Sequence, residues 1–171
     1  MNSKNELRTV AKEIRKNLNI EKLSSILREK LINHKFYKDA KNVLIYYPLN
    51  YEINLLPLLN DSFKNFYLPR VNGKNLEICP YHNGDKLLQS PMGIYEPVSE
   101  NTDINNIDLI IVPALMADKN GYRIGYGGGF YDRLLKNNKN AKTVTLLPSE
   151  LITENLIHEE HDIKIDCILH T

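Results

Sequence analysis

The stretch Ile107-Asp108-Leu109-Ile110-Ile111-Val112-Pro113 decides the fold class, because it holds the most apolar run of the 171-residue chain. A short, almost continuous apolar run is typical of a strand that is buried on both faces. Pro113 ends the run, since proline has no amide hydrogen for a β-ladder. Val43–Tyr47 has the same character and ends at Pro48. Strands of this kind indicate a mostly parallel sheet.

Two helices are predicted before the first strand. Ser3 and Glu6 have the Ser-x-x-Glu spacing of a capping box, so a helix is expected to begin there. Apolar residues then recur at helical spacing, which predicts one buried stripe on each helix. The stripe of the first helix is Leu7, Val10, Ala11, Ile14 and Leu18, and that of the second is Leu23, Ile26, Leu27, Leu31 and Ile32.

The rest of the chain alternates strands and helices. We expect strands at 66–69 and 76–79 joined by a turn at Asn72-Gly73, and later strands at 143–147 and 165–169. We expect a helix over 53–63, despite Pro57, and a short helix over 128–136. This alternation predicts one α/β domain spanning 1–171, with three αβα layers around a mostly parallel sheet.

The charge of the chain argues against a protein built to bind nucleic acid. The formal net charge is +1, and 42% hydrophobic with 25% charged residues is typical of a globular domain. The charge is uneven, because residues 1–41 hold eleven Lys and Arg against five Asp and Glu. The remainder holds eleven against sixteen. This asymmetry favours a local anion site.

Cysteine usage and hydropathy predict a cytoplasmic protein without a membrane partner. Cys79 and Cys167 lie far apart without CxxC spacing, so neither a disulfide framework nor a zinc site is expected, and both are interpreted as small core residues. The first residues have no apolar core of a signal peptide, and no apolar run approaches the roughly 20 residues of a membrane span.

The segment Asp118-Lys119-Asn120-Gly121-Tyr122-Arg123-Ile124-Gly125-Tyr126-Gly127-Gly128-Gly129-Phe130-Tyr131-Asp132 predicts a ligand site. Half of the eight glycines fall between positions 125 and 129, after the strongest strand and before a helix. Ligands of parallel sheets bind at this edge, and glycine lets backbone amides approach an anion. A tight surface turn is the alternative, but the flanking Arg123 and Asp132 favour a phosphate or carboxylate site. The pattern is neither a Walker A loop nor a dinucleotide fingerprint.

The glycine segment resembles the signature of the 5-formyltetrahydrofolate cyclo-ligase family, also called methenyltetrahydrofolate synthetases. The family's Gly-x-Arg-Leu/Ile-Gly-x-Gly-x-Gly-Tyr-Tyr-Asp matches Gly121–Asp132, with Phe130 in place of the first tyrosine. Pro48 stands where many members have a small polar residue. Further matches in the family's order are Lys4 with Arg8, Tyr46–Ile53, Leu68–Arg70, Gly93–Pro97 and His161–Asp166. The resemblance therefore spans essentially the whole chain.

The resemblance implies a ligase of folate one-carbon metabolism. Such an enzyme uses ATP and Mg²⁺ to convert 5-formyltetrahydrofolate to 5,10-methenyltetrahydrofolate, with release of ADP and phosphate. It also implies a fold similar to that of sugar-phosphate isomerases and CoA transferases. The partners expected are these small molecules alone, and the chain is expected to be a monomer or a weak dimer.

The same resemblance implies a role for each matching residue. Arg123 and Asp132 are expected to be catalytic, and Asp132 and Asp166 to bind Mg²⁺. Tyr47, Glu52, Tyr126 and Phe130 are expected at the folate. The residues expected at ATP are Lys4, Arg8, Arg123, Ile124, Gly125, Tyr126, Gly127, Gly128, Gly129, Phe130 and Tyr131.

Several of these residues have a structural interpretation when the family is set aside. Lys4 and Arg8 then belong to a solvated basic helix face that continues through Lys12, Arg15 and Lys16. Glu52 and Asp132 become acids of a first helical turn, Asp166 a polar strand start, and Tyr47 a core aromatic. Two other functions also stay open. The chain could be an ATP-using enzyme for another N-formyl or carboxylate substrate, or a folate or nucleotide sensor without catalysis.

Overall fold

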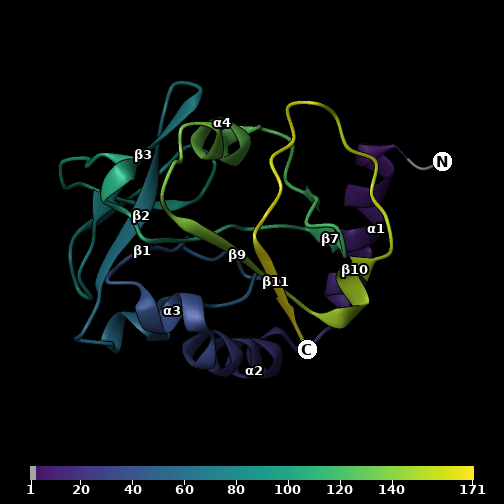
Figure 1. The fold of residues 1–171 in the computed structure, drawn as a ribbon, viewed down its shortest axis with the longest axis horizontal. Coiled ribbons are helices and arrows are strands. Elements are labelled where there is room, and N and C mark those ends of the chain that lie inside the picture. The colour runs from purple at the N-terminus through teal and green to yellow at the C-terminus, as the bar shows by residue number, and fades with distance from the viewer. Residues whose placement is uncertain (1–2) are drawn as a thin grey trace.

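A six-stranded sheet forms the centre of the protein in a computed structural model that describes residues 3–171 (Figure 1). The strand order is β11-β9-β6-β1-β2-β3, and only the β2–β3 pair is antiparallel. The bounds are β1 Asn42–Leu44, β2 Asn65–Asn72, β3 Asn75–Pro80, β6 Leu109–Ile111, β9 Lys142–Leu147 and β11 Cys167–His170. The apolar run that defined the fold class is the central strand β6. The mostly parallel sheet is therefore confirmed.

Helices cover both faces of this sheet. Helices α2 (Ile20–Asn33) and α3 (Lys35–Asp39) lie on one face and α4 (Phe130–Lys136) on the other (Figure 1). Along β1 the side chains alternate, since Val43 packs with the α2 side and Leu44 with the α4 side. A strand with both faces covered has no polar side, which explains the continuous apolar runs.

Helix α1 (Lys4–Lys16) stands beside the central sheet and packs against a smaller one (Figure 1). The predicted capping box is present, because Ser3 Oγ accepts from the Glu6 amide at 3.2 Å and Glu6 Oε2 accepts from the Ser3 amide at 2.8 Å. Ala11 is fully buried against this sheet, so the helix approaches it closely. The strands of the small sheet are β7 Met116–Asp118, β8 Arg123–Ile124 and β10 Ile152–Thr153.

The predicted hairpin is confirmed, and a second one was not predicted. Gly73 has φ +61° in the turn between β2 and β3, a conformation that favours glycine. The unpredicted hairpin pairs β4 (Leu87–Gln89) with β5 (Tyr95–Pro97). These strands have three residues each and include exposed positions, so their alternation of apolar and polar residues is too short to predict a strand from the sequence. Arg70 of β2 fixes this hairpin by donating to the carbonyl oxygens of Pro97 and Ser99 at 3.0 and 2.8 Å.

The helix expected over 53–63 is wrong. The segment forms only the 3₁₀ turn η1 (Leu56–Asn60), which has Pro57 near its start and Asp61 as its C-cap. Ile53, Leu55 and Leu58 fill the core without helical continuity, whereas Phe63 is exposed. The strand expected over 43–47 is shorter, because the chain leaves the ladder after Ile45, whose amide still donates to Tyr67 at 3.0 Å. The other short 3₁₀ turns are η2 (Ile104–Asn106) and η3 (Ser149–Leu151).

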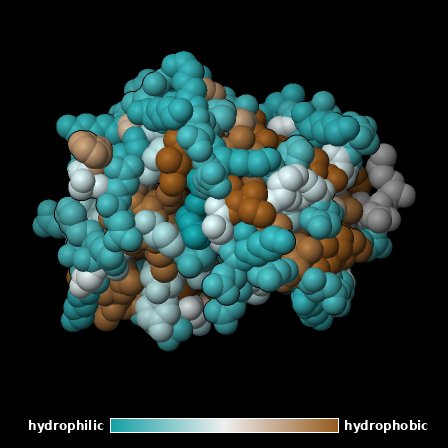
Figure 2. Space-filling view, turned by 90° about the horizontal axis from the view of Figure 1, so that it is seen from below, coloured by the Kyte–Doolittle hydropathy of each residue, from teal (hydrophilic) through white to brown (hydrophobic). Residues whose placement is uncertain are grey.

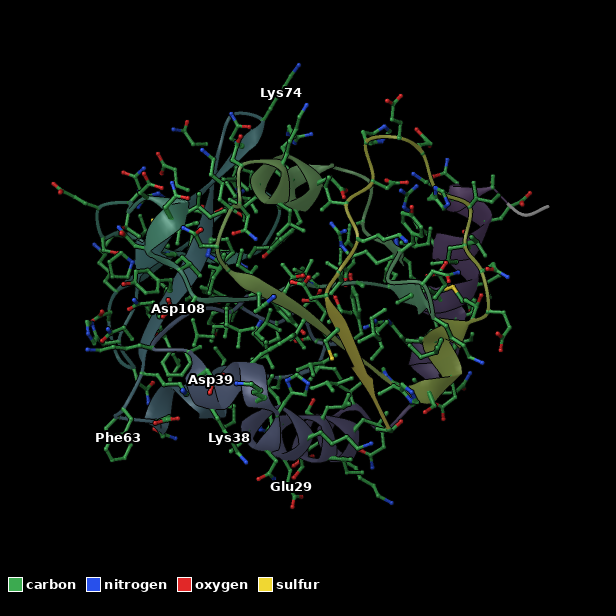
Figure 3. The ribbon with its side chains drawn as sticks, in the orientation of Figure 1. Glu29, Lys38, Asp39, Phe63, Lys74 and Asp108 are labelled. Carbon is green, nitrogen blue, oxygen red and sulfur yellow. The ribbon has the colours of Figure 1, made fainter. Side chains whose placement is uncertain are left out.

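The outer surface is mainly polar. Glu29 of α2 and Lys38 of α3 point away from the sheet (Figure 3). The view from below shows hydrophobic patches that hydrophilic side chains interrupt (Figure 2). Phe63 is the most exposed large hydrophobic side chain of the described part, at 89%. Within residues 3–171, no helix combines the length and apolar character that crossing a bilayer requires.

A buried carboxylate fixes the turn that leads into the glycine segment. Asp118 is 1% exposed, and its Oδ1 accepts from the amides of Asn120 and Tyr122, each at 2.9 Å. Its Oδ2 accepts from the amide of Leu156 at 2.9 Å. The same side chain therefore holds the chain before β8 and the segment after β10.

We predict that Asp118→Ala lowers the free energy of unfolding by about 3 kcal/mol or more, because three amides lose a charged acceptor. The matched variant Asp103→Ala removes an exposed carboxylate that accepts from the Asn105 amide at 2.8 Å, and it should cost about 1 kcal/mol. Urea denaturation of both variants measures the difference. Equal losses would contradict the structural role given to Asp118.

Candidate active site

A cavity of about 430 Å³ opens between the glycine segment, the start of α1, the loop after β1 and the β4–β5 hairpin. It lies beyond β1 and β6, where parallel sheets bind ligands. The cavity is lined by Lys4, Arg8, Tyr47, Glu52 and every residue from Arg123 to Asp132. Residues expected to act together from the sequence are thus brought to one place, with the exception of Asp166.

The glycine segment reverses the chain between β8 and α4. Gly127 has φ +104° and Gly129 has φ +67°, conformations that side chains other than glycine rarely adopt. Gly129 is also the N-cap of α4 and has no side chain to accept from the first-turn amides. The segment lines the cavity with glycines, and without Cβ atoms its backbone can approach an anion closely.

Two cations of α1 reach the cavity because they are four residues apart and share a helix face. Lys4 Nζ lies 2.6 Å from Asp162 Oδ2 and 3.1 Å from Glu159 Oε1. Burial lowers the pKa of Lys4, but the two acids outweigh burial and raise it. Arg8 Nε donates to the carbonyl oxygen of Gly125 at 2.8 Å. The start of α1 therefore holds both the glycine segment and the loop that carries Asp162.

The third cation, Arg123, is almost completely buried. Its Nη1 donates to Asp132 Oδ1 at 3.2 Å and to the carbonyl oxygen of Ile163 at 3.1 Å. Its Nε and the hydroxyl of Tyr131 are buried without a hydrogen-bond partner among the described residues. Unpartnered buried polar atoms are rare and costly, so their presence along one cavity is typical of a ligand site.

Glu52 is a buried acid held from two sides. Its Oε2 accepts from the Leu49 amide at 2.7 Å, and its Oε1 accepts from the Tyr126 hydroxyl at 2.6 Å. Burial raises the pKa of Glu52, and these two hydrogen bonds together with the charge of Arg15 only partly oppose it. Glu52 closes a turn rather than beginning a helix. The bond from Tyr126 joins the glycine segment directly to this acid.

The remaining wall is aromatic and apolar. Tyr46 and Tyr47 enter it where the chain leaves β1, and the rings of Tyr47 and Tyr95 lie 5.1 Å apart. Met92 and Ile94 of the unpredicted hairpin complete it. This wall suits a flat heteroaromatic ligand, and Glu52 supplies a hydrogen-bond acceptor beside it.

The acid of the His161–Asp166 segment that lines the cavity is Asp162, and the structure does not bring Asp166 there. Asp166 Oδ2 accepts from the amide and hydroxyl of Thr143 at 2.9 and 3.0 Å, which ties the start of β11 to β9. Burial alone would raise the pKa of Asp162, but hydrogen bonds from Lys4 and the Glu159 amide outweigh burial and hold this pKa below its usual value. The structure thus places Asp162 rather than Asp166 in the cavity, a difference that spacing alone does not predict, and the expected metal role of Asp166 stays a prediction.

The fold and the cavity define an α/β protein with an anion-binding glycine segment beside an aromatic, acidic wall. The sequence matches the 5-formyltetrahydrofolate cyclo-ligase family over residues 1–171, and the chain belongs to that family. It is accordingly an enzyme of the ligase class in folate one-carbon metabolism.

Individual relatives agree with the family. A 5-formyltetrahydrofolate cyclo-ligase of Haemophilus influenzae is 31% identical, with 96% of this chain and 95% of that protein covered. The solved 5,10-methenyltetrahydrofolate synthetase of Aquifex aeolicus is 34% identical with a TM-score of 0.87, covering 98% of this chain and 89% of that one. A synthetase of Mycoplasma pneumoniae is 19% identical with a TM-score of 0.79, covering 98% of each chain, and supports the fold alone. The likeness to sugar-phosphate isomerases and CoA transferases stays a prediction.

We predict that Gly127→Ala lowers the free energy of unfolding by about 1–3 kcal/mol, because alanine is strained at this φ. A Cβ there would also lie 3.4 Å from Arg8 Cζ. Gly125→Ala is the matched variant, since Gly125 has ordinary φ and a Cβ added there would meet no atom within 4 Å, and it should cost less than about 1 kcal/mol. Chemical denaturation compares them, and equal stability of both variants would refute the strain at Gly127.

Proposed function

We propose that this enzyme converts 5-formyltetrahydrofolate to 5,10-methenyltetrahydrofolate by ATP-driven phosphorylation of the formyl oxygen. The formyl oxygen attacks the γ-phosphorus and ADP departs. N10 then attacks the activated formyl carbon, the ring closes, phosphate leaves with the former formyl oxygen, and the N10 proton is released. A formamide is a poor electrophile and its oxygen a poor leaving group, so this transfer removes both obstacles at once.

The cation cluster and the glycine segment are proposed to hold the triphosphate. Lys4, Arg8 and Arg123 supply positive charge, and the segment from Gly125 to Gly129 supplies amides. Phosphoryl transfer needs little covalent help from a protein, so catalysis rests on positioning and on stabilising charge at the phosphoryl oxygens. Arg123 suits this role because its guanidinium is nearly buried, where electrostatic interactions are stronger.

The acidic and aromatic end is proposed to hold the folate. Glu52 accepts hydrogen bonds from the NH groups of the pterin, and Tyr47 borders the ring. Tyr126 and Phe130 lie between the two substrates, so they contact both. Phe130 has no hydroxyl, so it contributes packing alone at the position where the family usually has tyrosine.

The cavity residues also fit a magnesium ion. Asp132 and Asp162 line the cavity together, and carboxylate oxygens are preferred ligands of this hard cation. Within residues 3–171 the contacts of Asp132 fall on Oδ1, so Oδ2 remains for a ligand. We propose that these two acids hold the ion, which when bound would neutralise charge on the phosphate oxygens. Asp166 is left out because its carboxylate is bonded to Thr143.

One observation carries this proposal: a single cavity has three cations and an amide-rich turn at one end and a buried acid beside aromatic rings at the other. A phosphate donor and a flat acceptor therefore meet in one space. The proposed setting is a monomer or weak dimer in the cytoplasm that binds only these small molecules. The free thiols of Cys79 and Cys167 are consistent with a reducing compartment.

We predict that purified protein with Mg²⁺, ATP and 5-formyltetrahydrofolate forms the methenyl chromophore, with one ADP for each product formed. Omitting ATP should abolish the absorbance change, because the formyl oxygen then has no leaving group. Folate binding without product would instead favour a sensor. A chromophore formed only from another N-formyl compound would favour a different substrate.

We predict that Asp132→Asn and Asp162→Asn each raise the Mg²⁺ concentration for half-maximal rate about 10-fold or more, because each removes an anionic ligand. Asp166→Asn should leave that concentration unchanged and cost about 1 kcal/mol of stability. Glu159→Gln is the control for the Lys4 ion pair, since it removes the other acid beside Lys4 at 3.1 Å without changing the cavity lining. A raised requirement in Asp166→Asn alone would overturn the assignment of Asp162.

A further inference from the structure

Arg15 of α1 is buried behind the cavity wall, although the sequence pattern places it on an exposed basic face. The residue is 4% exposed, whereas Lys12 and Lys16 on the same helix are exposed. Its Nη1 donates to the carbonyl oxygen of Tyr51 at 2.7 Å, and its Nη2 donates to that of Ala114 at 2.6 Å. One guanidinium therefore joins two loops that lie far apart in the sequence.

These two loops form the wall around Glu52. Tyr51 immediately precedes Glu52, and Ala114 follows Pro113, which lines the cavity. The hydrogen-bond partners of Arg15 among residues 3–171 are all backbone oxygens, so no acid neutralises it by direct contact. A buried cation without a paired anion is costly unless an acid stands close by. Glu52 directly follows Tyr51, whose carbonyl oxygen Arg15 bonds, and the charge of Arg15 acts to lower the pKa of Glu52.

Helix periodicity explains how α1 contacts both the loops around Glu52 and the end of the cavity that is proposed to hold the nucleotide. Lys4, Arg8, Ala11 and Arg15 follow at intervals of four, three and four residues, so they share one face of α1. Ala11 is fully buried and lets this face approach the small sheet. The helix thereby presents two cations at the cavity and a third behind Glu52.

We propose that Arg15 is a positioning residue for substrate binding: it fixes the loops on either side of Glu52 and so holds this carboxylate in place for the folate. The inference rests on the proposed function only in naming folate as the ligand. The buried guanidinium, its two carbonyl partners and its place behind the acid do not depend on that name.

The other titratable groups facing Glu52 are hydroxyls. Tyr46 and Tyr51 come from its own segment, Tyr126 from the glycine segment and Tyr131 from α4. Burial and the proximity of Glu52 raise the pKa of Tyr46, Tyr126 and Tyr131, so these groups stay neutral in the working range, and the Tyr126 hydroxyl donates to Glu52. Arg15 is thus the positive charge that opposes the effect of burial on Glu52.

The test compares Arg15→Met with Arg15→Lys. Arg15→Met removes the charge, so the pKa of Glu52 should rise further, and the acid limb of the pH profile of kcat/KM for folate should move to higher pH by the same amount. We expect KM for 5-formyltetrahydrofolate to rise about 10-fold at neutral pH, while KM for ATP changes less than about 3-fold. Arg15→Lys keeps the charge but not both carbonyl bonds, so it should keep the wild-type pH midpoint and raise KM less.

Arg28→Met is the matched control. Arg28 of α2 also donates to a backbone oxygen of this loop, that of Asn54 at 2.7 Å, but it does not act on Glu52. It should leave the pH midpoint unchanged. An equal shift in Arg28→Met, or a wild-type midpoint in folded Arg15→Met, would overturn the role of Arg15.

A second readout separates this inference from the proposed function. NMR titration of the Glu52 carboxyl carbon, assigned by its loss in Glu52→Gln, follows its ionisation without substrate. The expected upward movement of the midpoint in Arg15→Met, with Arg15→Lys near wild type, supports the inference even if the wild-type enzyme forms no methenyl product. If Arg15→Met does not fold, Arg15→Lys is the deciding variant. Its positive charge is still present, so a raised titration midpoint of Glu52 in Arg15→Lys overturns the inference.

Discussion

The reversal of the chain at Gly127 and Gly129 is the constraint on which the site depends. Only residues without a side chain adopt these positive φ values at little cost, and the turn brings the end of β8 against α1. Arg8 Cζ lies 3.4 Å from the position that a Cβ of Gly127 would take. Because the turn is tight, α4 begins immediately after it, and Tyr126 reaches Glu52 on the far side of the cavity.

The proposed ligand-binding groups already have partners within the protein. Lys4 pairs with Asp162, Arg8 with the carbonyl of Gly125, and Arg123 with Asp132. The proposed substrate binding is therefore an exchange of hydrogen bonds rather than a capture by free charges. Such pairing holds the cations near their working positions, so less conformational freedom is lost when the phosphates replace the internal acceptors. The Tyr126–Glu52 bond extends the same network to the folate end.

The sequence supported the sheet and much of the site, because both depend on local patterns. Continuous apolar runs identified the buried strands, the Ser3–Glu6 spacing identified the helix start, and glycine spacing identified the turn. The predictions that differ from the structure concern the direction in which a side chain points in the folded protein. Arg15 follows a basic pattern and yet points inward, since α1 packs along the face of Ala11. The sequence pattern of a charged helix does not indicate which of its faces packs against the rest of the protein.

Similar reasons explain the other differences. The apolar positions of 53–63 satisfied a helical period, but burial of Ile53, Leu55 and Leu58 is achieved by an irregular chain around a single 3₁₀ turn. Asp162 and Asp166 lie four residues apart in a segment with no regular helix, so spacing carries no information on direction. Thr143 bonds Asp166 and Lys4 bonds Asp162, and these partners decide which carboxylate enters the cavity.

Helix α1 sets the relation between the two ends of the proposed reaction. Lys4 and Arg15 are separated by eleven residues, which is about 16 Å of helix axis. Phosphoryl transfer requires the donor phosphorus and the acceptor oxygen to be aligned within a fraction of an ångström, and flexible loops alone hold such alignment poorly. Helix α1 carries Lys4 and Arg8, the cations proposed for the nucleotide, at one end, and Arg15 supports the Glu52 wall at the other, so both walls are fixed to one rigid element. Regular secondary structure then sets the relative position of the two reacting groups, and the glycine turn does not have to set it alone.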